Sequence, residues 1–265
     1  MRSSYNCPMP FELKSRRQGP TAPVSDAERA TRVDLAAAYR LVALERWDDL
    51  IYSHISASVP NEQGYFLINP LGLTFDEVTA SNLVKINEAA EIIGDSPHSV
   101  NVTGFALHGA LHAARPDAGC VLHLHETAAI AVSAQREGLL PLSQHALRFE
   151  GELAYHDYEG LAFSPREGES LVRALGGKTA LLLRNHGLVV LGRTVAEAYV
   201  LAVTLIKACR IQIAAQGGNA ALHRPRDKVI ALAAEQLRDG GAVEGVAEWP
   251  ALLRKLDRID PEFRN

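Results

Sequence analysis

The chain has 265 residues, of which 47% are hydrophobic and 22% charged, and its 27 basic and 31 acidic side chains leave a net charge of −4. This composition is typical of a globular protein and excludes global disorder and fibrous repeats. The acidic balance and an aromatic content of 6% argue against nucleic-acid binding through the phosphate backbone or through stacked bases.

Cysteine content and the N-terminal segment bear on the location of the protein. Cys7, Cys120 and Cys209 are too few and too scattered for a disulfide framework, and they form no CxxC pair that would bind zinc. The chain has no uninterrupted apolar run near the ~20 residues of a membrane span, and its start lacks the apolar core of a secretory signal. We therefore expect a cytoplasmic protein without a membrane partner, with an irregular arm at 1–24 and one domain over 25–265.

Hydrophobic periodicity, capping boxes and turn residues predict helices and strands that intermix without a regular βαβ rhythm. In chain order the predicted elements are a helix over about 25–46, strands over 51–59 and 65–69, a short helix near 79–84, a helix over 103–114, a strand over 119–125, a helix over 127–137, strands over 152–156, 179–184 and 188–191, a long apolar helix from 194 to about 216, and amphipathic helices over 227–238 and 249–256. The strand pairs indicate hairpins, so we expect an α/β domain with a largely antiparallel sheet covered by helices.

Histidines carry the clearest chemical signal. Alternate residues of a strand share a face, so His123 and His125 should project side by side, and two imidazoles at this spacing can reach one metal ion. His186, where an apolar strand meets a turn, is a candidate third ligand. The alternative for His186 is a turn histidine bonded to the local backbone.

Two further histidines, His108 and His112, are four residues apart and share one face of the helix that precedes this strand. Either His108 leans toward the metal, or both are solvated helix side chains. The chain has no GxGxxG or Walker sequence and no GxSxG elbow, so neither a nucleotide cofactor nor a serine nucleophile has support.

Several segments of the chain resemble the class II aldolase/adducin family. The segment 104–125 contains RPD followed by the HxH pair, and 182–188 contains the NHG motif. Other segments resemble the adducin head domain, at 67–73, 77–87, 138–144 and 154–160. The resemblance implies a three-layer α/β/α fold with a central antiparallel sheet. It also implies a divalent ion, usually zinc, held by His123, His125 and His186, and a homotetramer with sites at subunit boundaries.

The chain departs from the aldolase pattern around this implied site. In the aldolases a glutamate that coordinates the metal and handles protons lies four residues before the histidine that matches His108; here that residue is Gly104. The serine pair that binds the substrate phosphate is absent, and the asparagine of the first strand is His54. Because helix side chains lean toward the N-terminus, we expect His108 to fill the space and to act as the catalytic proton-handling group or a fourth ligand. The alternative is a helix histidine with no part in the site.

These observations favour a divalent-metal-dependent enzyme, with zinc preferred over manganese or iron(II). We expect a lyase acting on a small carboxylate or carbonyl compound, by retro-aldol cleavage or decarboxylation through a metal-stabilised enolate. One alternative is a non-catalytic, adducin-like oligomerising module, and another is a three-histidine non-haem iron oxygenase. A small-molecule substrate and further copies of the chain are the expected partners, with a tetramer favoured because the apolar helix at 194–216 has stripes that need partners.

Overall fold

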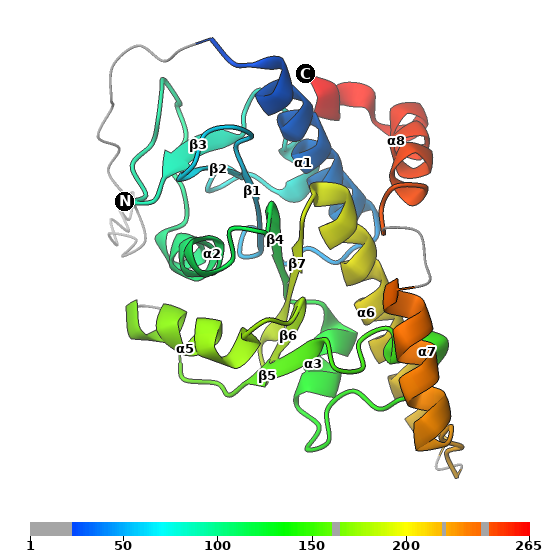
Figure 1. The fold of residues 1–265 in the computed structure, drawn as a ribbon. Helices are drawn as coiled ribbons and strands as arrows, with labels where there is room; N and C mark the ends of the chain where they lie inside the picture. The colour runs from blue at the N-terminus through cyan, green and yellow to red at the C-terminus, as the bar shows by residue number, and fades with distance from the viewer. Residues whose placement is uncertain (1–22, 161–164, 219–220, 240–243) are drawn as a thin grey trace, which may run out of the picture.

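The computed structural model describes residues 23–160, 165–218, 221–239 and 244–265, which are arranged around one seven-stranded sheet (Figure 1). The strands follow the order β3-β2-β1-β4-β7-β6-β5 across the sheet, and every neighbouring pair is antiparallel except β5 with β6. They are β1 His54–Ser58, β2 Tyr65–Ile68, β3 Val84–Asn87, β4 Cys120–Leu124, β5 Leu153–His156, β6 Ala180–Leu183 and β7 Gly187–Gly192. The predicted α/β fold with a largely antiparallel sheet is confirmed. Most of the predicted N-terminal arm lies outside the described residues.

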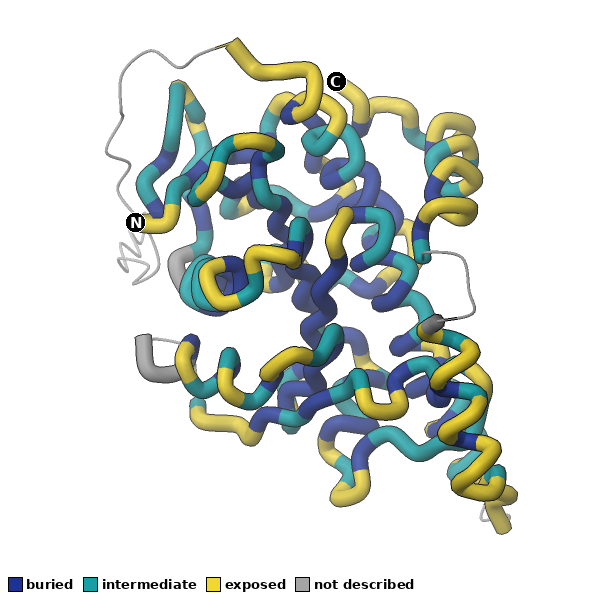
Figure 2. Tube along the Cα trace, in the orientation of Figure 1, coloured by how far each residue is buried: buried dark blue, intermediate teal, exposed yellow. Residues whose placement is uncertain are grey.

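Helices cover both faces of this sheet. One face carries α2 Val102–Ala114 and α5 Pro165–Leu175, and the other carries α1 Asp26–Leu44, α3 Thr127–Ser133 and α6 Val195–Gln216 (Figure 1). The remaining helices are α4 Gln144–Leu147, α7 Asp227–Asp239, α8 Glu248–Ile259 and the 3-10 turns η1 Phe75–Glu77 and η2 Pro261–Arg264. Burial is deepest along the central strands, whereas α7 and α8 keep one face exposed (Figure 2).

The alternation of side chains along the central strands divides the core in two. Leu122 of β4 packs in the larger cluster with α1 and α6, and its neighbour Val121 packs in the smaller cluster with α2 and α5. His123 follows the same alternation and therefore points to the α2 side. The polar side chains of β1 also lie there: His54 and Ser56 are buried under α2.

Helix α6 is long and apolar enough to cross a membrane by length and composition alone. In the structure it packs against the sheet, α1 and α3, as a core helix does, and Val195, Tyr199 and Ile206 are buried within the chain. Tyr199 lies between the rings of Trp47 and Trp249. The expectation that this stripe needs a second copy of the chain is therefore wrong for these three side chains.

Some predicted elements differ from the observed ones. The helix near 79–84 is absent: the Asn82 side chain accepts a hydrogen bond from the Thr79 amide at 2.9 Å, and the Asn82 amide donates to Thr79 Oγ1 at 3.3 Å. Such local side-chain bonds compete with helical ones, and the segment forms a turn before β3. The helix expected over 127–137 ends at Ser133 as α3. The parallel β5–β6 pair, joined through α5, was not expected from the sequence.

Candidate metal centre

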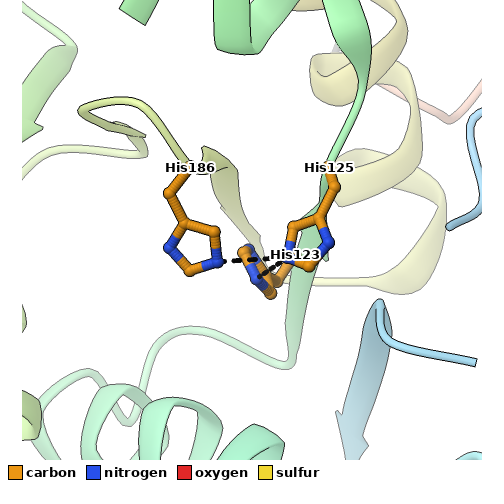
Figure 3. A group of neighbouring side chains, drawn as sticks. All are labelled: His123, His125 and His186. Carbon is orange, nitrogen blue, oxygen red and sulfur yellow. Dashed lines mark hydrogen bonds between the residues drawn. The ribbon is translucent and has the colours of Figure 1, made fainter. Parts of the chain in front are cut away.

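Three histidines from distant parts of the chain bring their Nε2 atoms together (Figure 3). The Nε2 atom of His125 lies 3.1 Å from that of His123 and 3.1 Å from that of His186. Among the described residues these side chains form a group whose potential ligand atoms all lie within 4.8 Å of one another. The structure therefore brings together the three residues that the sequence analysis named as metal ligands.

Strand pairing explains how the three side chains meet. His123 lies in β4 and His125 directly after it, while His186 lies in the turn between β6 and β7, and β7 pairs with β4. In that turn Asn185 has a φ of 60°, and the Asn185 amide donates to Ser133 Oγ at 3.0 Å. Arg184 Nη1 donates to the carbonyl oxygen of Ser133 at 3.0 Å. The end of α3 therefore holds the turn that carries His186.

Hydrogen bonds at the opposite ring nitrogens determine which way two of the imidazoles present their lone pairs. His123 Nδ1 lies 3.0 Å from the carbonyl oxygen of Leu188, which can only accept, so Nδ1 carries the proton. His125 Nδ1 likewise donates to the Asp49 carboxylate at 2.9 Å. A neutral imidazole that carries its proton on Nδ1 has a lone pair on Nε2, the atom that binds a metal. The lone pairs of His123 and His125 thus converge, an arrangement that a bound cation stabilises.

The protonation state of the site suits metal binding. Burial, together with the neighbouring His125 and His156, lowers the pKa of His186 to about 4. Burial, with the nearby His125, His186 and His54, also holds the pKa of His123 well below its usual range. Both imidazoles are therefore neutral at pH 7, the state in which histidine coordinates a metal.

The converging donor set fits a divalent metal ion. Neutral imidazole nitrogens are preferred ligands for zinc, and protein sites with three ligands leave a coordination position open. Asp49, which orients His125, was not singled out from the sequence, because its loop position carries no periodic or motif signal. Its contact depends on the path of the chain after α1.

His108 does not belong to this group and does not fill the space left by Gly104. Its ring is buried, and its Nδ1 atom lies 2.7 Å from Ser56 Oγ. A Cβ atom at Gly104 would lie 2.7 Å from ring atoms of His54, so the ring in that space belongs to His54. The expected placement of His108 beside Gly104 is therefore wrong. Its role as a proton-handling group stays a prediction.

His112 also differs from the expectation of a solvated side chain. It is buried, its Nε2 atom lies 2.7 Å from Ser56 Oγ, and its ring stacks on Phe66 with centroids 4.6 Å apart. The helix face that carries both histidines packs on the sheet.

The family model for the class II aldolase and adducin N-terminal domain matches residues 33–213. The chain belongs to the class II aldolase and adducin family. A solved structure, an aldolase II superfamily protein from Pseudomonas syringae, is 50% identical with a TM-score of 0.86, over 91% of this chain and 98% of that one. The L-fuculose 1-phosphate aldolase from Glaciozyma antarctica PI12 is 26% identical with a TM-score of 0.81, over 94% and 97% of the two chains.

The adducins form the other branch of this similarity. Alpha-adducin of Rattus norvegicus is 49% identical over 189 residues, which cover 70% of this chain and 26% of the adducin. The family predicted from the HxH and NHG segments is confirmed by both branches.

Proposed function

We propose that this chain is a divalent-metal-dependent lyase that acts on a small carboxylate or carbonyl compound. The observation that carries the proposal is the convergence of three Nε2 atoms, two of them on rings whose Nδ1 protons are already donated. Three imidazole ligands with an open coordination position are more typical of a catalytic than of a structural metal site. Zinc is the preferred ion, with manganese and iron(II) as alternatives.

A divalent ion bound there would polarise a carbonyl oxygen and stabilise negative charge that develops next to it. The chain itself holds the ligands in place: Asp49 and the Leu188 carbonyl oxygen keep the protons of His125 and His123 on Nδ1. Among the described residues the converging ligand group contains no carboxylate. A loaded site of this composition is positively charged and favours an anionic substrate.

A cavity of about 370 Å³ lies beside His125 and is not lined by His123 or His186. Its lining includes Arg46 and Arg210 as well as the acidic residues Asp48 and Glu126. Arg210 forms an ion pair with Glu126 at 3.0 Å, which leaves Arg46 and Asp48, one basic and one acidic side chain, in the charged lining.

A non-catalytic, adducin-like module is the second candidate function. It is favoured by the sequence identity of 49% to rat alpha-adducin, against 26% to the L-fuculose 1-phosphate aldolase. An iron oxygenase is a further alternative, because imidazole ligands also suit iron(II). We propose a cytoplasmic homotetramer for either enzyme.

Metal analysis of protein purified without added ions tests the proposal. We expect about one zinc per chain, followed by turnover of a keto or hydroxy acid in a screen of small acids. Iron together with oxygen consumption would favour the oxygenase. A metal-free chain that keeps its oligomeric state and thermal stability would favour the assembly module.

A further inference from the structure

We propose that His54 is a positioning residue of the metal centre, and that Gly104 is the residue that gives its imidazole room. The inference rests on the proposed function insofar as a metal binds to the three histidines. Its structural part, the pairing of His54 with Gly104, stands without the metal.

Strand register places His54 beside His123, one of the three proposed metal ligands. In the antiparallel pair of β1 and β4, His54 lies directly opposite His123, so both side chains project from the same face of the sheet. Their rings lie 23° from parallel with centroids 6.2 Å apart. Only 4% of the surface of His54 is exposed. The buried imidazole of His54 therefore lies beside the ring of His123.

Gly104, in the first turn of α2, closes the space around this ring. A Cβ atom at residue 104 would lie 2.7 Å from Cε1 and Nε2 of His54 and 2.8 Å from Cδ2, nearer than real Cβ contacts occur. The backbone next to His54 is held in place, because the amide of the adjoining Ile55 donates to Tyr39 Oη at 2.7 Å, and the ring itself is held by Asn101 Nδ2 at 3.0 Å. Glycine is unfavourable inside a helix, so its presence here calls for a local reason. The ring of His54 is that reason.

Asn101 gives the His54 ring a defined tautomer. The amide of Gly104 donates to Asn101 Oδ1 at 3.4 Å, which turns Asn101 Nδ2 toward His54 Nε2 at 3.0 Å. Because an amide nitrogen only donates, His54 Nε2 accepts and the single proton lies on Nδ1.

A chain of hydrogen bonds links His112, Ser56 and His108 near the His54 ring, and its donors and acceptors can be assigned in order. His112 Nδ1 donates to the carbonyl oxygen of Ala118 at 3.2 Å, so its Nε2 accepts from Ser56 Oγ. Ser56 Oγ then accepts from His108 Nδ1, which leaves a lone pair on His108 Nε2. The rings of His54 and His108 lie edge to face with centroids 5.8 Å apart.

Each of these two rings also has one nitrogen without a described partner, and the two nitrogens are complementary in kind. His54 Nδ1 is a donor and His108 Nε2 an acceptor, and both are buried without a hydrogen-bond partner among the residues that the structure describes. The ring of His54 therefore accepts from Asn101, lies edge to face with the ring of His108, and lies nearly parallel to the ring of His123.

A double-mutant cycle on the metal-free full-length chain tests the pairing of the two residues. We expect Gly104→Ala to lower the melting temperature of the wild type, because the new methyl group collides with His54. In the His54→Ala background the same change should leave the melting temperature unchanged or raise it. Gly109→Ala is the matched control, since its neighbour is the half-buried Phe105 ring, and it should act alike in both backgrounds. His54→Asn, which is shorter and polar, serves in the cycle if His54→Ala does not fold.

Metal binding tests the positioning role. We expect His54→Ala to weaken zinc binding about tenfold, the effect typical of residues that orient ligands, and to shift the visible absorption bands of the cobalt(II)-loaded protein. His54→Gln should restore most of both properties, because its side-chain oxygen can accept from Asn101.

Two results would overturn the inference. One is a Gly104→Ala effect of equal size in both backgrounds, and the other is wild-type zinc affinity and cobalt spectrum in His54→Ala. A wild-type chain that binds neither metal contradicts the proposed function instead, and the melting-temperature cycle still decides whether His54 and Gly104 are paired.

Discussion

The contact between Asp49 and His125 makes a sharp prediction about metal affinity. The carboxylate accepts the His125 Nδ1 proton at 2.9 Å, which directs the Nε2 lone pair to the metal position. Partners of this kind typically contribute 10–100-fold to metal affinity. Because 44% of the Asp49 side chain is exposed, solvent screens its charge, and we expect the lower end of that range.

Asp49→Ala should therefore weaken zinc binding about tenfold, which corresponds to about 1.4 kcal/mol. Asp49→Asn keeps an oxygen that accepts the same proton but loses the negative charge, so its affinity should fall between those of the wild type and Asp49→Ala. The melting temperature of the metal-free chain should change little in either variant, since the position is half-exposed.

The assay is competition for zinc with a chromogenic chelator at pH 7.5. Asp48→Asn is the matched control, because this neighbouring carboxylate has no hydrogen bond to the three histidines among the described residues. The substitution should leave zinc affinity unchanged. An unchanged zinc affinity in Asp49→Ala, or an equal loss of zinc affinity in Asp48→Asn, would contradict the role of Asp49 in orienting His125.

The remaining predictions concern the ligands, pH, the core and assembly. Alanine at His123, His125 or His186 should remove most bound zinc; stoichiometric zinc in the triple variant, measured by elemental analysis, would place the site elsewhere. Burial lowers the pKa of His112 to about 4, so between pH 6.5 and 4 the unfolded chain binds more protons than the folded one. Stability should therefore fall as pH falls through that window, and His112→Gln should show a shallower slope in thermal melts of the metal-free chain. Tyr39→Phe should destabilise the fold by about 1–3 kcal/mol in urea titrations, because buried amides of β1 and of the residue after β2 lose their acceptor; an unchanged midpoint would contradict this. Light scattering at micromolar concentration should give the mass of a tetramer or at least a dimer, and a monomer would count against a site completed by neighbouring subunits.

The fold class, the family and the three histidines whose Nε2 atoms converge were all predicted from the sequence. Strand alternation places His123 and His125 on one face whatever the rest of the chain does, since that period is a local property of extended backbone. His186 required the family resemblance, because its distance from the pair in sequence carries no geometric information.

Only the tertiary structure decided what surrounds the ligands. Asp49 reaches His125 because of how the chain leaves α1, and His54 lies beside His123 because of the β1–β4 register. The lean of helix side chains alone predicts His108 beside Gly104. That prediction is wrong because the ring that fills this space comes from another element, and contacts between elements depend on packing that no local pattern encodes.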